Sequence, residues 1–182
     1  MTTVSTPGSH GQINTLAYPG KLLSPNHCEV KMNLKKQPTA KAELLIRKPV
    51  AEVFEAFIDP DVITKFWFER SSGRLERGGA VKWYWDLFEF SIDVLARDIV
   101  KNERILIEWR VENGNLTTVE WTFTPRTDDT TYVSIVVDGF TGDADQIVAQ
   151  ALDSAGGFAL VLAAAKAWLE HGIQLNIVAD RF

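Results

Sequence analysis

The chain has 182 residues, with 19 basic and 24 acidic side chains and a net charge of −5. Hydrophobic residues make up 46% of it and charged residues 24%, which is ordinary for a globular domain and excludes collagen-like, low-complexity and disulfide-scaffold proteins. Six Trp, ten Phe and three Tyr are an unusual number of aromatic side chains, and they require a large core, a cavity, or both.

Residues 1–40 are predicted to form an N-terminal extension that is disordered or loosely docked, and residues 41–182 to form one domain. Pro and Gly recur through the extension among Ser, Thr and Asn, and no helical or strand period survives there. An arm that docks on the domain is the alternative interpretation. Met32, the only Met after Met1, is also a candidate start of the chain.

Charge is divided unevenly between these two parts. The extension is basic, whereas residues 41–182 carry 15 basic against 23 acidic side chains. An acidic domain repels phosphate backbones, so we expect no nucleic-acid partner. No continuous apolar run approaches the ~20 residues of a membrane span, and none resembles a signal peptide. The chain has a single cysteine, Cys28, which favours a reducing, cytoplasmic location.

The domain is predicted to begin with a strand over 43–47, followed by two short helices. Asp59 is a suitable N-cap for the second helix, over 61–66, with Pro60 at its first position. The first helix is expected over 49–58, because its apolar residues form one stripe at helical spacing: Val50, Val53, Phe54, Phe57 and Ile58.

A run of strands should follow. Apolar and polar residues alternate with period two, which is typical of an antiparallel sheet that is wet on one face and covered on the other. Short turns such as residues 113–115 and 127–129 separate the segments. The segments are residues 81–86, 88–96, 105–111, 118–123 and 133–138.

The last predicted element is helical, from about Asp145 to His171, with Gly172 as its stop. Two adjacent glycines, Gly156 and Gly157, cost roughly 1–2 kcal/mol in a helix interior, so we expect them to divide a short helix from a long one. The long helix is the only element large enough to cover the sheet. The strand residues facing the space beneath it are bulky: Trp83, Trp85, Phe90, Trp109, Trp121 and Phe123.

Several motifs together resemble a known superfamily. Residues 49–60, PVAEVFEAFIDP, resemble the opening of the START-related superfamily, also called SRPBCC. The aromatic pair in Lys65-Phe66-Trp67 matches its branch similar to activator of heat-shock-protein-90 ATPase homologues. Later motifs follow in family order: Gly78-Gly79, Ile107-Glu108-Trp109, Val119-Glu120-Trp121-Thr122-Phe123, Asp138-Gly139-Phe140 and Gly157-Phe158.

The resemblance covers roughly residues 42–175 and implies an α+β helix-grip fold. In that fold a curved antiparallel sheet of about six to seven strands wraps a long C-terminal helix, with a cavity between them. Phe158 stands where the family usually has Trp, so the cavity floor is expected to differ in size. The end over 163–172 resembles uncharacterised bacterial members more than the eukaryotic co-chaperone. That co-chaperone has a separate N-terminal domain that drives chaperone binding, and residues 1–40 are too short to be it.

The sequence offers little for catalysis or metal binding. His10 and His27 lie in the extension and His171 ends a helix, so neither a metal cluster nor a catalytic triad can be assembled. We therefore predict no catalytic residue, no metal and no cofactor, and an enzyme is the less favoured interpretation. The charged strand residues are out of phase with the aromatic rows and should face solvent: Glu89, Asp93, Glu108, Arg110 and Glu120.

We predict a binding protein for a hydrophobic small molecule, an apolar or aromatic ligand held between the sheet and the helix. The alternative is that the Trp rows simply fill the core. Trp67 follows the second helix, where it would form a rim of the pocket or cap the core. The candidate lining residues are Trp67, Trp83, Trp85, Phe90, Trp109, Trp121, Phe140, Phe158 and Leu162.

Two other functions stay open. A co-chaperone-like activator of the heat-shock-protein-90 ATPase would have the chaperone as its partner. A polyketide cyclase or aromatase would need a polar side chain inside the cavity. Tyr84, Arg110 or Asp138 would point inward only if a β-bulge shifts the register of its strand.

Overall fold

The structure is a computed structural model, and it describes residues 37–110 and 116–180. The chain separates into two units, Met1–Val30 and Lys31–Phe182, and every element named below belongs to the second. The extension expected over 1–40 lies outside the described residues up to residue 36. Ala40, its last residue, already belongs to the first strand.

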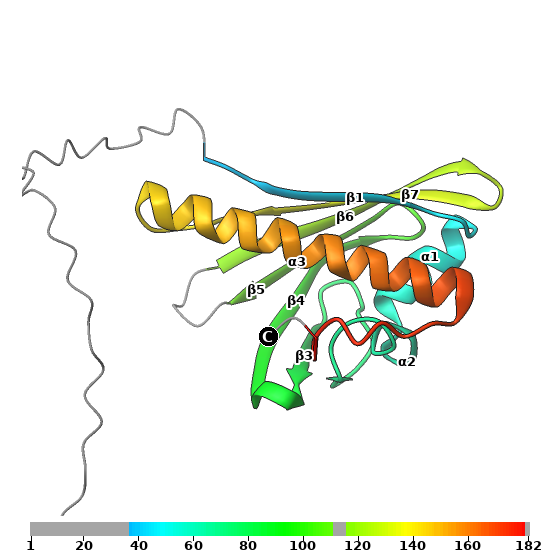
Figure 1. The fold of residues 1–182 in the computed structure, drawn as a ribbon, viewed down its shortest axis with the longest axis horizontal. Coiled ribbons are helices and arrows are strands. Elements are labelled where there is room, and N and C mark those ends of the chain that lie inside the picture. The colour runs from blue at the N-terminus through cyan, green and yellow to red at the C-terminus, as the bar shows by residue number, and fades with distance from the viewer. Residues whose placement is uncertain (1–36, 111–115, 181–182) are drawn as a thin grey trace, which may run out of the picture. The chain divides into compact units, whose positions relative to one another are not determined.

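The fold is α+β, with a seven-stranded antiparallel sheet and a long C-terminal helix, as the resemblance implied (Figure 1). The strands lie in the order β1-β7-β6-β5-β4-β3-β2, so the first strand joins the sheet beside the last. The elements are β1 Ala40–Ile46, α1 Val50–Ile58, α2 Pro60–Ile63, β2 Arg70–Ser71, β3 Ala80–Trp85, the 3-10 turn η1 Asp86–Phe88, β4 Phe90–Val100, β5 Arg104–Arg110, β6 Leu116–Thr127, β7 Thr130–Asp138 and α3 Ala144–His171.

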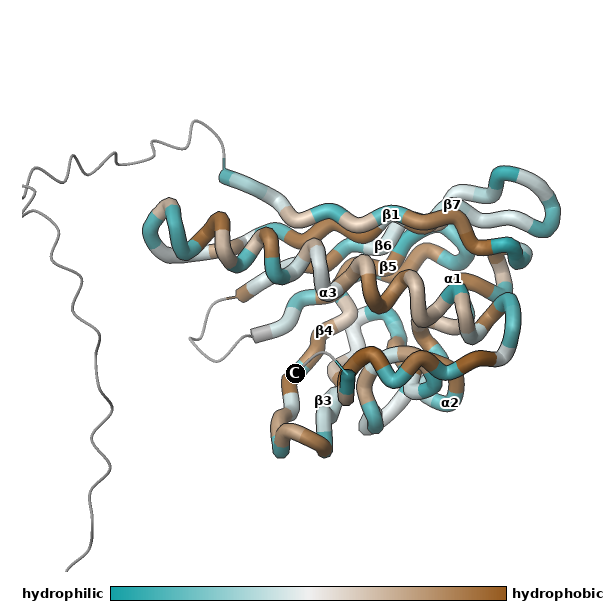
Figure 2. The backbone as a smooth tube through the Cα atoms, viewed as in Figure 1, coloured by the Kyte–Doolittle hydropathy of each residue, from teal (hydrophilic) through white to brown (hydrophobic). Residues whose placement is uncertain are grey.

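The predicted alternation along the strands is confirmed: buried and more exposed residues alternate in β6 and β7, and hydropathy changes from residue to residue along the strands (Figure 2). In β6, Val119 and Trp121 are buried while Glu120 between them is half-buried on the outer face. Val119 pairs with Ile107 on β5 and with Val137 on β7, so inward residues of neighbouring strands lie side by side. Such lateral pairs turn a period of two in the sequence into a continuous apolar surface.

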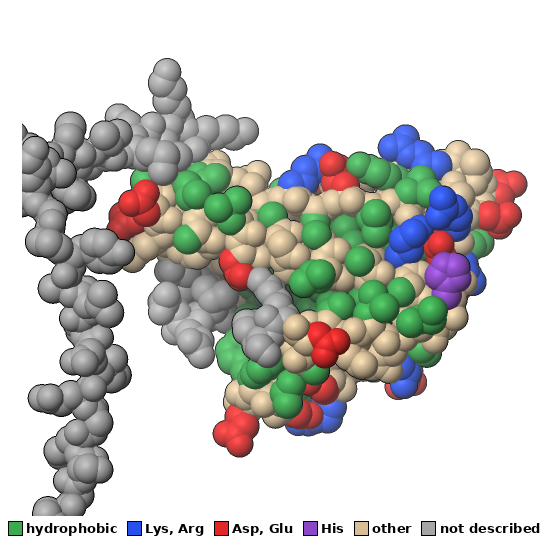
Figure 3. Space-filling view, viewed as in Figure 1, with side chains coloured by type: hydrophobic (Ala, Val, Ile, Leu, Met, Phe, Trp, Pro, Cys, Tyr) green, Lys and Arg blue, Asp and Glu red, His purple; other side chains and the backbone are tan. Residues whose placement is uncertain are grey.

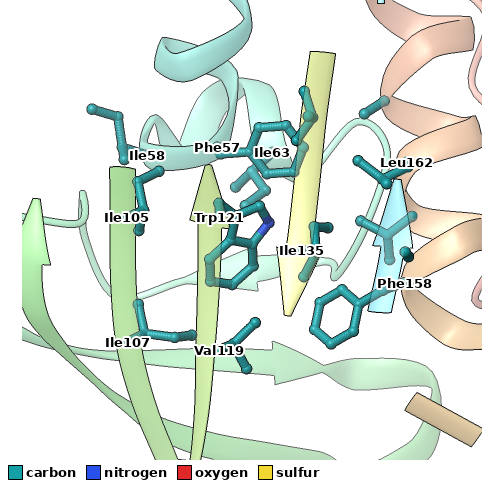
Figure 4. Close-up of a cluster of buried hydrophobic side chains, with 14 of the residues drawn as sticks. Phe57, Ile58, Ile63, Ile105, Ile107, Val119, Trp121, Ile135, Phe158 and Leu162 are labelled. Atoms are coloured by element: carbon teal, nitrogen blue, oxygen red, sulfur yellow. The ribbon is translucent and has the colours of Figure 1, made fainter. Parts of the chain in front are cut away.

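The two short helices cover one end of this surface. Asp59 caps α2, as predicted, by accepting a hydrogen bond from the Asp61 N–H. Residues 64–66 form turns instead of extending α2 to residue 66. The ring of Phe57 on α1 lies 5.4 Å from that of Phe66, in the turn after α2, and 6.3 Å from that of Trp121 on β6 (Figure 4). Aromatic packing therefore joins α1 both to this turn and to the sheet.

Helix α3 is continuous over 28 residues, which corrects the predicted break at Gly156-Gly157. A Cβ on Gly156 would meet no atom within 4 Å, so this glycine faces open space and makes no close approach. The inner face of the helix packs on the sheet through residues on both sides of the pair, including Ala151, Phe158 and Leu162. That burial outweighs the helix propensity lost at two glycines.

Both ends of α3 are secured. Asp143 and Gln146 form a reciprocal capping box at the N-terminus, and Gly172 adopts φ 68° at the C-terminus. Of the described helices, α3 alone is long and apolar enough to span a membrane. It packs against β1 and β7 as the cover of the sheet, and its Ala-rich sequence accounts for its apolar character.

A polar cluster ties the last turn of α3 to the end of β1. The Lys166 ammonium donates a hydrogen bond to the Leu45 carbonyl at 2.8 Å and pairs with the Glu170 carboxylate. That carboxylate also accepts the Arg47 backbone N–H at 2.6 Å, and its side chain is only 7% exposed. Burial by itself would raise the pKa of Glu170, but Lys166 and Arg47 hold it below its ordinary value of 4.5.

Candidate functional site

A cavity of about 1040 Å³, widely open to solvent, lies between α3 and the sheet. Its walls come from the inward faces of β3 to β7, from the connection after α2, and from α3 itself. Hydrophobic side chains also gather on the surface at the β3–η1–β4 end of the molecule (Figure 3). The lining residues are Trp67, Trp85, Phe88, Phe90, Ile92, Trp109, Thr117, Val137, Phe140, Gln150, Asp153, Ser154, Gly157, Phe158, Leu160, Val161, Ile177 and Val178.

Six of the nine residues predicted to line a pocket lie on this cavity: Trp67, Trp85, Phe90, Trp109, Phe140 and Phe158. The other three are packed inside the core and do not line it. Trp83 is 1% exposed, Trp121 is 2% exposed and Leu162 is 1% exposed. The same sheet face therefore carries both a packed region and residues that line the cavity.

Trp67 lies at the centre of the aromatic wall. Its ring centroid is 5.1 Å from Trp83 in the core, 5.5 Å from Phe158 on α3 and 6.3 Å from Trp109 on β5. The rings of Trp109 and Phe158 are nearly parallel, with 20° between their planes and centroids 5.9 Å apart. These contacts hold the aromatic rings of the wall in place against one another.

Four polar side chains of the lining were not among the predicted site residues: Thr117, Gln150, Asp153 and Ser154. Thr117 is 5% exposed and pairs with Trp109 across the β5–β6 ladder. The inward rows are therefore less uniformly apolar than expected. Thr117 has the same phase as Val119 and Trp121, so alternation could have found it. Gln150, Ser154, Gly157 and Val161 share one helix face by spacings of three and four residues.

The segment after α3 also reaches the cavity, and no sequence period indicated this. Beyond Gly172 the chain runs back toward β3 (Figure 1), and Ile177 packs against the core. Ile177 and Val178 line the cavity on one side. On the other side they line a small hollow of about 130 Å³ together with Lys65. Isolated apolar residues in an irregular segment are not placed by periodicity.

The charged strand residues form ion pairs outside the cavity. Glu108 pairs with Arg97, Asp93 with Lys82, and Arg104 bridges Asp98 and Glu120. The β-bulge between Ala96 and Asp98 lets Asp98 join this outer network.

Tyr84, Asp138 and Arg110 were expected to point into the cavity only if a β-bulge shifted the register of their strands. Tyr84 lies under the Arg70 guanidinium at 4.1 Å. Asp138 is exposed and accepts the Gly139 N–H. The Arg110 side chain lies outside the described part of the chain. Within residues 37–110 and 116–180, no three His, Cys, Asp or Glu side chains are placed to share a metal ion.

Solved structures with the same fold were found by comparison. The SSP2350 protein from Staphylococcus saprophyticus is 25% identical, with a TM-score of 0.66, over 76% of this chain and 96% of that one. The Aha1 dimer from Colwellia psychrerythraea is 16% identical, with a TM-score of 0.62, over 74% and 98%. DynU16, a protein of the dynemicin biosynthetic locus, is 20% identical, with a TM-score of 0.62, over 75% and 48%.

A search among curated proteins found no match. A family model described as activator of Hsp90 ATPase homolog 1-like protein matches residues 47–168, from the end of β1 to the last turns of α3. The match spans α1, every strand from β2 to β7 and most of α3, so it includes nearly all elements that build the cavity. By this match, the chain belongs to the family of activator of Hsp90 ATPase homolog 1-like proteins.

Proposed function

We propose that this protein binds an apolar, aromatic small molecule in the cavity under α3, without catalysing a reaction on it. The observation that supports this most directly is the cavity itself, about 1040 Å³ in volume and lined on several sides by aromatic rings. Pockets for drug-sized molecules occupy several hundred to about 1,000 Å³ and are mostly apolar with few placed polar groups. A cytoplasmic location belongs to the same proposal.

The shape of the aromatic wall supports a flat ligand. Trp109 and Phe158 stack on each other with their centroids 5.9 Å apart, and Trp67 meets both rings at steep angles, so a ligand ring would pack on the sides of this cluster that the three rings do not cover. A ligand ring can therefore stack on one face while its edge meets another, which are the two favourable geometries for aromatic pairs. Flexible aliphatic chains would leave these faces less completely covered.

The proposal is tested by titrating the full chain with N-phenyl-1-naphthylamine, an uncharged aromatic probe whose emission rises in apolar surroundings. We expect saturable binding with one probe per chain. Ser154→Phe places a ring in the cavity and should weaken binding at least tenfold, because the probe and the new ring compete for space. Leu152→Phe is the matched control, since Leu152 is 69% exposed on the same helix and does not line the cavity.

The binding measurements distinguish the proposed function from the cyclase alternative. Equal binding by the Ser154→Phe and Leu152→Phe variants would place the probe elsewhere and contradict the proposal. Saturable binding followed by chemical conversion of a bound aromatic substrate, seen by mass spectrometry, would favour the cyclase alternative. Thr117, Asp153 and Ser154 are the side chains to substitute in that case, because they are polar and line the cavity.

A second candidate is activation of a chaperone ATPase, and the family match is the observation that favours it. In that case the purified chain should raise the ATP turnover of an Hsp90-type chaperone from the same organism. An unchanged turnover at a large excess of the chain would reject this candidate.

A further inference from the structure

We propose that Arg70 is a positioning residue of the cavity: its guanidinium holds the β3–β4 turn, residues 86–89, and with it the aromatic rings on one side of the lining. The proposal rests on the proposed function, since it names a residue on which ligand binding depends. Arg70 pairs with Tyr84 on the outer face of the sheet and does not itself line the cavity.

The β3–β4 turn determines where three lining rings lie. Trp85 precedes the turn, Phe88 belongs to it and Phe90 follows it, and all three line the cavity. The ring centroids of Trp85 and Phe90 are 5.6 Å apart. Trp85 also lies 6.5 Å from Trp67, the central ring of the aromatic wall. A shift of the turn would therefore change the shape of this side of the cavity.

The turn contains a residue in an unfavourable conformation. Glu89, its last residue, adopts φ 51° and ψ 32°, in the left-handed region that a Cβ disfavours. Inside the turn, the Glu89 N–H donates to the Asp86 carbonyl at 3.2 Å. Such a conformation persists when the surrounding structure holds it in place. Contacts from outside the turn are therefore important for its position.

Arg70 supplies such a contact from β2. Its Nε and Nη2 atoms donate hydrogen bonds to the two carboxylate oxygens of Asp86, the first residue of the turn, at 2.7 and 2.8 Å. These bonds lower the pKa of the Asp86 carboxyl from its ordinary 3.8, so Asp86 is charged at neutral pH. The guanidinium also lies over the Tyr84 ring, 4.1 Å from its centroid. Two parallel bonds and a stacked ring fix both the distance and the orientation of the pair.

The same contact joins two segments whose rings meet on the inner face of the sheet. Arg70 follows the connection that carries Trp67 and Phe68. In that connection the Glu69 N–H donates to the Tyr84 carbonyl at 3.1 Å, and the Phe68 ring lies 5.6 Å from Trp85. The Arg70–Asp86 pair thus links the Trp67 segment to the β3–β4 turn from outside the cavity.

A lysine at this position would not replace Arg70. Its ammonium is a compact charge that cannot bond both Asp86 oxygens in one plane while stacking on Tyr84. The side chains of Arg70 and Asp86 are 59% and 47% exposed, and exposed ion pairs contribute little to folding stability. Loss of the paired hydrogen bonds should therefore disturb the position of the turn more than the stability of the fold.

The experiment measures binding of N-phenyl-1-naphthylamine to the full chain by emission titration. Asp86→Ala should raise the Kd at least threefold, because the lining rings are then held less firmly. Arg70→Lys should raise it nearly as much, although it keeps the charge. The double variant should lose no more than the weaker-binding single variant, since both changes remove one interaction. The emission of the bound probe at saturation should also fall in these variants, because water reaches it more easily.

Arg74→Lys is the matched control. Arg74 makes a similar pair of contacts with Glu55 on α1, at 2.6 and 2.8 Å, and neither residue lines the cavity. This variant should leave both the Kd and the emission of the bound probe unchanged. Urea unfolding should show similarly small losses of stability for Arg70→Lys and Arg74→Lys, which separates positioning of the turn from folding.

The possible failures are distinguishable. If Arg70→Lys and Asp86→Ala bound the probe like the wild type while Ser154→Phe weakened binding, the proposed function would stand and the positioning role would be overturned. Equal weakening by Arg70→Lys and Arg74→Lys would also overturn that role, since a general loss of stability would explain both. Asp86→Ala tests the same contact should Arg70→Lys fail to fold. A wild-type chain that bound no probe would overturn both proposals.

Discussion

Two regions under the same sheet face differ sharply in how they are filled. At the α1 end, Trp121 is 2% exposed and lies against Phe57 and Phe158. At the opposite end of the neighbouring ladder, Trp109 is half-buried and borders the cavity. Both Trp residues have the inward phase of their strands. The difference comes from what covers them, because α1 reaches only the Trp121 end.

The comparison shows that a row of inward aromatic side chains does not by itself determine whether it is packed in the core or borders a cavity. Where a helix brings its own rings to the row, as α1 does with Phe54 and Phe57, the rings interlock and exclude solvent. Where the covering face of α3 carries Ser154 and Gly157, too little side chain reaches the sheet to fill the space. Residue size on the covering helix therefore decides which part of the row stays open.

The largest expected effect tests this difference directly. Phe57→Ala should lower the free energy of unfolding by about 3–4 kcal/mol, because Phe57 is 2% exposed and contacts three aromatic rings. Trp109→Ala should cost about 1–2 kcal/mol despite its larger side chain, because it already borders an open space. Urea unfolding of both variants checks this, and equal losses would mean that the two regions are packed alike.

The second prediction concerns the attachment of α3 to β1. Glu170→Ala should lower the free energy of unfolding by about 2 kcal/mol, since it leaves the Arg47 N–H without its acceptor and removes the carboxylate that pairs with the Lys166 ammonium. His171→Ala, at the exposed neighbouring position, should change it by less than about 0.5 kcal/mol. Thermal unfolding would refute the role of Glu170 if both variants melted together.

The third prediction is a pH dependence from the same residue. The pKa of Glu170 is lower in the folded chain than its ordinary 4.5, so the folded state binds this proton less readily than the unfolded state. Its contribution to stability is complete above the unfolded pKa and is lost as the pH falls through the folded value. Urea unfolding between pH 7 and pH 3 should show a shallower decline for Glu170→Gln than for the wild type. Parallel declines would contradict this.

The smallest effect is expected at the glycine pair of α3. Gly156→Ala should raise the free energy of unfolding by about 0.5–1 kcal/mol, because a Cβ there meets nothing and Ala favours the helix. Gly139→Ala is the contrast, since Gly139 has φ +92° and a Cβ would lie 2.7 Å from the Leu116 carbonyl oxygen. A loss of stability at Gly156 would instead show that this glycine is needed for packing.

Much of the fold follows from local patterns. The alternation in residues 81–86, 88–96, 105–111, 118–123 and 133–138 predicted five of the seven strands, and the Asp59 cap was predicted from its position before Pro60. The two-residue strand β2 was not predicted, because Arg70 and Ser71 are too few residues to show a period. The break expected at Gly156-Gly157 was wrong, since helix propensity is weak beside the burial of a whole helix face.

The sequence predicted only some of the residues that line the cavity. Trp85 and Trp109 could be assigned to the inward face because the strand period determines facing, and Phe158 was proposed from the family resemblance. Periods could not separate them from Trp83 and Trp121, which face the same way but are packed. Ile177 and Val178 joined the lining through an irregular segment that no pattern indicates.

The sequence by itself determined the fold class, the inward aromatic rows and the family resemblance, because facing and turn chemistry depend on neighbours along the chain. Only the tertiary structure decided which part of the aromatic surface is core and which part borders the cavity. That division depends on where α1 packs on the sheet, and on how the small residues of α3 lie over it. Both are distances between segments far apart in the chain, and local sequence does not encode them.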